Sequence, residues 1–111
     1  MLKVLYIEDS QDWVDIITDS LQDEGEDLTF YSSNSLVEAN KILKKEKFDV
    51  VICDGSITDP NDGLKYAEQL HAQGQPVILL SVSLRSAKFP SMGKNEYDPQ
   101  KLYNLIKKVI K

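Results

Sequence analysis

The sequence predicts an α/β fold in which a parallel sheet is covered by helices on both faces. Three short, unalternated apolar runs, at residues 4–7, 50–53 and 77–80, are typical of strands buried on both sides. Segments with apolar residues at helical spacing lie between these runs. Because strands and helices alternate along the chain, right-handed crossovers are expected to place helices on both faces of the sheet.

The first half of the chain contains two expected helices and a weaker strand. The first helix follows the strand at residues 4–7, and its inward stripe recurs every fourth residue at Trp13, Ile17 and Leu21. Gly25 lies just beyond it, where a helix is expected to end. A weaker strand at residues 28–31 follows. The spacing of Ser35 and Glu38 then predicts the capped start of a second helix.

The second half of the chain contains two further expected helices. Asn61 precedes a pattern that runs to Gly74 and has three inward apolar residues, Leu64, Ala67 and Leu70. Pro76 begins the next strand, where its missing N–H group is harmless. Asp98 followed by Pro99 predicts the capped start of the last helix. The buried stripe of that helix comprises Leu102, Leu105, Ile106 and Val109.

Length, charge and composition narrow the class of protein. The 111 residues fit one domain, so we expect a single domain over residues 1–111 with no output domain. The net charge of −5 argues against direct binding to nucleic acid. With Cys53 as its one cysteine the chain can form no internal disulfide. No segment is typical of a signal peptide or a membrane span, so a cytoplasmic location without membrane contact is expected.

Acidic residues follow two of the predicted strands. Glu8 and Asp9 come after the first strand and Asp54 after the third. Sites in open α/β sheets form at the C-terminal ends of strands, so these three carboxylates should converge if the strands are neighbours. Such a cluster needs a cation, and hard oxygen ligands suit Mg²⁺. Asp54, which Gly55 leaves accessible, is the candidate nucleophile. Alternatively an acid such as Asp9 only caps the next helix.

The sequence resembles a response-regulator receiver domain of two-component signalling over nearly its whole length. The matching segments are residues 4–10, 48–54, 62–64, 76–81 and 97–102. The resemblance implies a flavodoxin-like, doubly wound, five-stranded parallel sheet with strand order 2-1-3-4-5. It also implies that Asp54 accepts a phosphoryl group from a sensor histidine kinase or a histidine phosphotransfer protein. A downstream protein target would read the aspartyl phosphate through direct contact.

The resemblance further implies a role for each matching residue. Mg²⁺ would be held by Glu8, Asp9, Asp54 and the backbone carbonyl of Ser56. The Ser81 hydroxyl would bond the phosphoryl group, and Ser56 and Ser83 would tune the lifetime of the aspartyl phosphate. The family lysine that pairs with the phosphoryl group matches Lys94, with Lys88 as the alternative. Catalysis would not extend beyond the protein's own phosphorylation and dephosphorylation.

Two regions depart from the family pattern. Only ten residues, 84–93, separate Ser83 from Lys94, too few for a mean helix of ~11–12 residues plus a strand. The helix between the fourth and fifth strands is therefore expected to be missing or reduced to a turn, and the chain to be a monomer or a weak dimer. In the loop after Asp54, Asp59 and Asp62 either assist the metal or are solvated loop acids.

Two other functions remain open from the sequence. A degenerate receiver would bind partners without being switched by phosphorylation, and the shortened region favours it. A phosphatase of the haloacid-dehalogenase type is the second alternative, because residues 54–58 resemble its nucleophile motif. That motif requires a second aspartate where Ser56 stands and usually follows the first strand.

Overall fold

The computed structural model, which describes residues 1–25, 27–86 and 88–110, contains a single parallel sheet in the part described. The strands are β1 (Leu2–Ile7), β2 (Leu28–Ser33), β3 (Val50–Cys53), β4 (Val77–Ser81) and β5 (Ser91–Gly93). Their order is β2-β1-β3-β4-β5, which confirms the expected flavodoxin-like topology. The helices are α1 (Gln11–Glu24), α2 (Leu36–Lys45), α3 (Asp62–Ala72) and α4 (Pro99–Ile110), and a short 3₁₀ helix, η1 (Lys94–Glu96), follows β5.

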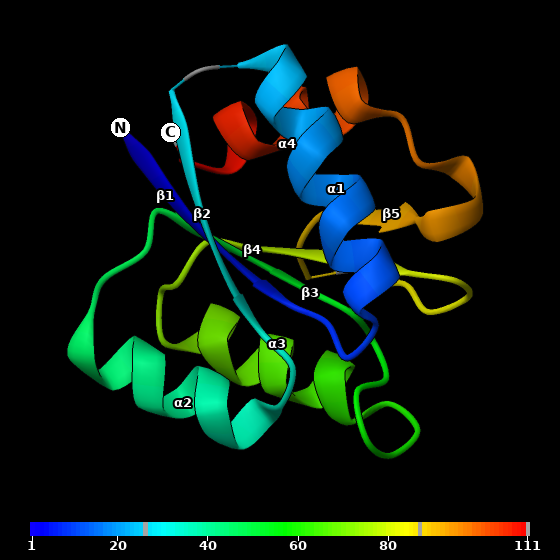
Figure 1. The fold of residues 1–111 in the computed structure, drawn as a ribbon. Coiled ribbons are helices and arrows are strands. Elements are labelled where there is room, and N and C mark those ends of the chain that lie inside the picture. The colour runs from blue at the N-terminus through cyan, green and yellow to red at the C-terminus, as the bar shows by residue number, and fades with distance from the viewer. Residues whose placement is uncertain (26, 87, 111) are drawn as a thin grey trace.

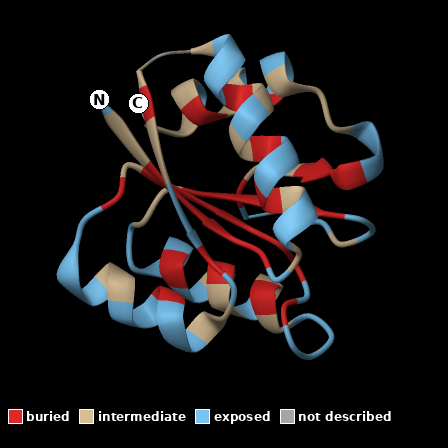
Figure 2. Cartoon of the chain, viewed as in Figure 1, coloured by how far each residue is buried: buried red, intermediate tan, exposed pale blue. Residues whose placement is uncertain are grey.

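Helices cover both faces of the sheet (Figure 1). α1 and α4 pack on one face, and α2 and α3 pack on the other. Side chains alternate along β1, so Tyr6 joins the core under α1 and α4 while Ile7 joins the core under α2 and α3. The central strands are buried along most of their length between these layers (Figure 2). Within the buried strands β1, β3 and β4 there is thus little room for a polar site, and such a site is expected among the residues that follow them.

Side-chain caps are present at three helix starts, and two of them, Ser35 and Asp98, were predicted from the sequence. Ser10 caps α1, and its hydroxyl accepts a hydrogen bond from the Trp13 N–H at 3.4 Å. Ser35 accepts one from the Glu38 N–H at 3.1 Å. The carboxylate of Asp98 accepts from the backbone N–H groups of Gln100 and Lys101. The interpretation of Asp9 as the cap of the first helix is wrong, because the extended backbone of Ser10 places its own hydroxyl there.

The connection between β4 and β5 was expected to lack a full helix. This is confirmed for its described residues, 82–86 and 88–90, none of which is helical. Phe89 is buried and Leu84 partly buried against the core on the α2 and α3 side. The Phe89 ring also lies against His71 of α3, with ring centroids 5.4 Å apart. Two apolar side chains therefore cover part of the surface that a helix would cover.

The start of α3 lies directly against the backbone of Asp54. Gly63 is buried there, and a Cβ built on it would lie 1.9 Å from the carbonyl oxygen of Asp54. The next residue, Leu64, donates its N–H to the carbonyl of Gly55 at 3.0 Å. Glycine at position 63 therefore lets the helix approach the loop that carries Asp54.

Replacing Gly63 by alanine is expected to destabilise the protein by about 1–3 kcal/mol, because the added methyl group forces α3 away from Asp54. In an unhindered helix the same change would stabilise by about 1 kcal/mol, so the sign of the effect is diagnostic. Urea denaturation measures it, with Gln69→Ala on the exposed face of α3 as the control. A stabilised Gly63→Ala variant would contradict the close approach.

Candidate metal and phosphoacceptor site

The three predicted acids come together at the C-terminal edge of β1 and β3. Ile7 pairs with Cys53 in the sheet, so the residues that follow each strand lie side by side, and the Asp54 N–H donates to the Ile7 carbonyl at 3.0 Å. One carboxylate oxygen from each of Glu8, Asp9 and Asp54 lies within 4.8 Å of the others. The strand order thus places the predicted residues in one cluster.

Glu8 is the most deeply buried of these acids, with 1% of its surface exposed. Its Oε1 accepts a hydrogen bond from the Tyr6 hydroxyl at 2.9 Å and lies 2.5 Å from Nζ of Lys94. Its Oε2 accepts the N–H of Ser10 at 3.2 Å. Because a buried carboxylate is costly unless it is paired and hydrogen-bonded, these partners are what allow Glu8 to be buried.

Lys94 is the lysine that lies among the acids. It follows β5, is 8% exposed, and places Nζ 3.4 Å from Oδ2 of Asp54 in addition to its contact with Glu8. Lys88, the alternative from the sequence, instead pairs with Glu68 of α3 at 3.4 Å and is well exposed. Of the two candidate lysines, Lys94 is therefore the one in contact with the acidic cluster.

The oxygen donors of the cluster suit a hard divalent cation. Asp54 is 8% exposed, whereas Asp9 is exposed and opens the cluster to solvent. Although exposed, the Asp9 carboxyl is desolvated enough to raise its pKa above the ordinary value, and the neighbouring Glu8 raises it further. A cation would relieve this crowding of negative charge, and one or two carboxylates with several waters are the ligands that Mg²⁺ prefers.

The remaining predicted residues of the site are Ser56, Ser81 and Ser83. Ser81 ends β4 and is buried, and a Cβ built on Gly55 would lie 2.9 Å from its Oγ and 2.5 Å from Cδ1 of Leu84. The side chains of Ser56 and Ser83 are exposed, and the Ser56 hydroxyl accepts the N–H of Asn61 at 3.1 Å. The proximity of Leu84 was not predicted, because the connection after β4 has no repeating pattern.

The family model described as "Response regulator receiver domain" matches residues 4–93. The chain belongs to the response regulator receiver family. Receiver domains are in general signalling modules rather than enzymes. They interact with histidine kinases or phosphotransfer proteins, and they bind Mg²⁺ at an acidic pocket. A search of curated sequences found no significant match.

Solved structures agree with this assignment at the level of the fold. A response regulator receiver domain from Francisella shares 19% identity with a TM-score of 0.80, over 99% of this chain and 97% of that one. A receiver domain from Methylobacillus flagellatus shares 18% identity and a TM-score of 0.80, over 98% of both chains. The receiver domain of a DNA-binding response regulator from Colwellia psychrerythraea shares 20% identity and a TM-score of 0.82, over 99% and 98%.

Asp62 organises the loop after Asp54 in this receiver domain. Its carboxylate accepts the backbone N–H groups of Ile57 at 2.6 Å and of Thr58 and Asp59 at 3.0 Å each. Burial alone would raise the pKa of Asp62, but these hydrogen bonds outweigh it and hold the pKa below its usual value. Asp62 is therefore a structural acid of the loop, a role that neither of the two predicted alternatives described.

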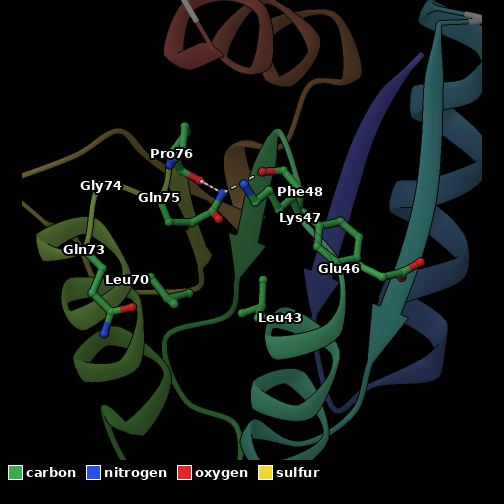
Figure 3. A pocket seen from close by; sticks show the side chains of 9 residues that line it. All are labelled: Leu43, Glu46, Lys47, Phe48, Leu70, Gln73, Gly74, Gln75 and Pro76. Carbon is green, nitrogen blue, oxygen red and sulfur yellow. Dashed lines mark hydrogen bonds between the residues drawn. The ribbon is translucent and has the colours of Figure 1, made fainter.

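A separate cavity of about 470 Å³ lies at the opposite edge of the sheet, beside the N-terminal ends of β3 and β4 (Figure 3). Its apolar wall includes Leu43, Phe48 and Leu70. The side-chain amide of Gln75 donates to the carbonyls of Phe48 and Pro76, both at 3.2 Å. None of the three site acids lines it, so this cavity is separate from the metal and phosphoacceptor site.

In the described part of the chain, no helix combines the length and apolar character needed to cross a membrane.

Proposed function

We propose that this receiver domain accepts a phosphoryl group on Asp54 in a reaction that requires Mg²⁺. The observation that carries the proposal is the cluster of Glu8, Asp9 and Asp54, with Lys94 in contact with two of its members. A cluster kept only for the fold would not need an exposed acid beside two buried ones. The donor would be a histidine kinase or a histidine phosphotransfer protein.

The chemistry follows from the position of the Asp54 carboxylate. One of its oxygens forms a bond to phosphorus while the bond from phosphorus to the donor's histidine nitrogen breaks. The nitrogen leaves with the electron pair of that bond and takes up a proton, and the product is an aspartyl phosphate. Glu8, Asp9, Asp54 and the Ser56 carbonyl would hold Mg²⁺, which would neutralise charge on the transferred group.

Two further residues, Lys94 and Ser81, would bind the product. Nζ of Lys94 is 3.4 Å from Asp54 Oδ2, so a short movement away from Glu8 would bring it to a phosphoryl oxygen. The hydroxyl of Ser81 lies beside Gly55 and could donate a hydrogen bond to the same group. Both interactions would strengthen once the phosphoryl group is attached. Such a product could be recognised in the cytoplasm by a downstream protein.

Incubation with phosphoramidate tests this proposal without a cognate kinase. With Mg²⁺ present, the intact mass should increase by one phosphoryl group, and EDTA should prevent the increase. Re-addition of Mg²⁺ to the EDTA-treated sample serves as the control for damage to the protein. If no phosphoryl group is gained over a wide range of donor and Mg²⁺ concentrations, the proposal fails.

In that case a degenerate receiver, which binds partners without phosphorylation, becomes the better description. The observation that favours it is the connection between β4 and β5, whose described residues contain no helix. In receiver domains this helix belongs to the surface that changes on phosphorylation. The acidic cluster opposes this alternative, because a partner-binding role alone does not require it.

We expect the shortened connection to prevent dimerisation driven by phosphorylation, because part of the usual dimer surface is missing. Sedimentation velocity should give a monomer both with and without beryllofluoride, which mimics the bound phosphoryl group. The Asp54→Asn variant provides the control for nonspecific effects of the mimic. A shift from monomer to dimer only in the wild type would contradict this expectation.

A further inference from the structure

A row of four contacting side chains passes through the acidic cluster and consists of Tyr6, Glu8, Lys94 and Trp13. It begins at Tyr6, which is 1% exposed and packs in the core beneath α1 and α4. The Tyr6 hydroxyl donates to Glu8 Oε1 at 2.9 Å, and the same oxygen contacts Nζ of Lys94.

Trp13 forms the other end of this row. Its ring centroid is 5.0 Å from Nζ of Lys94, within the range of a cation–π interaction. The indole is half-buried against the core on the α1 and α4 side, and the sequence predicts it as a core residue. The ammonium group of Lys94 therefore has an aromatic face as well as the carboxylates of Glu8 and Asp54 around it.

Tyr6 and Trp13, at the two ends of the row, each limit the position of one charged group. Tyr6 contacts the carboxylate of Glu8, and Trp13 contacts the ammonium group of Lys94. Glu8 Oε1 has two donors, Tyr6 and Lys94, and Oε2 has the N–H of Ser10. If Lys94 moved from Glu8 to a phosphoryl group, Tyr6 would be the donor left on Oε1 among the described residues. After the same movement, the ring of Trp13 would still contact the ammonium group of Lys94.

We propose that Tyr6 and Trp13 are positioning residues, Tyr6 orienting Glu8 as a metal ligand and Trp13 holding Lys94 near the phosphoryl group on Asp54. This inference rests on the proposed function. The two residues act through different partners, so their loss has separable effects. Loss of the Tyr6 hydroxyl affects metal binding, whereas loss of the Trp13 ring affects phosphoryl transfer.

The size of each effect follows from general measurements. Removing a group that orients a metal ligand typically weakens metal binding 10–100-fold, so Tyr6→Phe should raise the Kd for Mg²⁺ about tenfold. A cation–π contact that is partly shielded from water is worth enough to change a rate about tenfold. Trp13→Leu should therefore slow phosphorylation by phosphoramidate about tenfold at saturating Mg²⁺, with the Kd for Mg²⁺ changed less than about twofold. Trp13→Phe keeps an aromatic face and should restore most of the rate.

The test measures the Kd for Mg²⁺ by isothermal titration calorimetry and the phosphorylation rate by intact mass. Tyr66→Phe is the matched control, because Tyr66 lies on α3, across the sheet, and its hydroxyl makes a long contact of 3.4 Å with Asn40. Thermal unfolding of each variant separates a loss of fold from a loss of positioning. The control should match the wild type in both measurements.

The outcomes separate this inference from the proposed function. A wild type that binds no Mg²⁺ and takes up no phosphoryl group would overturn both. If the wild type does both, unchanged values in Tyr6→Phe and Trp13→Leu would overturn the inference alone. Equal losses of both properties in both variants would also overturn it, because they would indicate a general structural role. The predicted split, with recovery in Trp13→Phe, would support it.

Discussion

Replacement of Lys94 by methionine is expected to lower the free energy of unfolding by about 3–5 kcal/mol at pH 7 in the presence of EDTA. Methionine preserves most of the side-chain length but removes the ammonium group. The carboxylate of Glu8, which is 1% exposed, then loses its ionic partner, and the charge of Asp54 nearby is no longer balanced. Urea denaturation of wild type and variant measures the difference.

Lys88→Met is the matched control for this prediction. It breaks an exposed ion pair with Glu68, which should change stability by less than about 1 kcal/mol. Added Mg²⁺ should recover part of the stability lost in Lys94→Met, because the ion binds the folded site and supplies positive charge. A loss for Lys94→Met as small as that for the control would show that Glu8 does not depend on Lys94.

The second large effect is expected for Asp54→Asn, which should take up no detectable phosphoryl group from phosphoramidate. Asparagine has nearly the same shape, but its amide lacks the anionic oxygen that attacks phosphorus. The fold should persist, because the pairing of Lys94 with Glu8 does not involve Asp54. Intact mass after incubation with donor and Mg²⁺ measures the result.

Asp59→Asn provides the comparison for this variant, because Asp59 is an exposed acid in the loop that follows Asp54. It should be phosphorylated to the same extent as the wild type. Uptake that persists in Asp54→Asn and disappears in Asp59→Asn would assign the acceptor to the loop and contradict the proposed role of Asp54.

Much of the fold was predictable because buried parallel strands have a distinctive pattern. The apolar runs located β1, β3 and β4, although β1 begins earlier, at Leu2. β5 has only three residues, Ser91–Gly93, and no apolar run, so the pattern could not locate it. The strand order came from the family resemblance, because apolar periodicity does not specify which strands are neighbours.

The candidate site was predictable where it depends on position along a strand. Glu8, Asp9 and Asp54 follow strands that share an edge, so their proximity needed no side-chain detail. The choice between Lys94 and Lys88 did need it, because the shortened connection changes the usual spacing. The contact of Trp13 with Lys94 depends on how α1 and η1 lie relative to one another, which a single sequence does not specify.

The most direct test of the central claim is chemical mapping of the modified residue. Borohydride reduces an aspartyl phosphate to homoserine, and peptide mass spectrometry then locates the change in the chain. After phosphorylation with phosphoramidate and Mg²⁺, we predict homoserine at position 54, and none in a sample treated with EDTA. Homoserine at another acid, or a phosphoryl group on a residue other than an aspartate, would contradict the account.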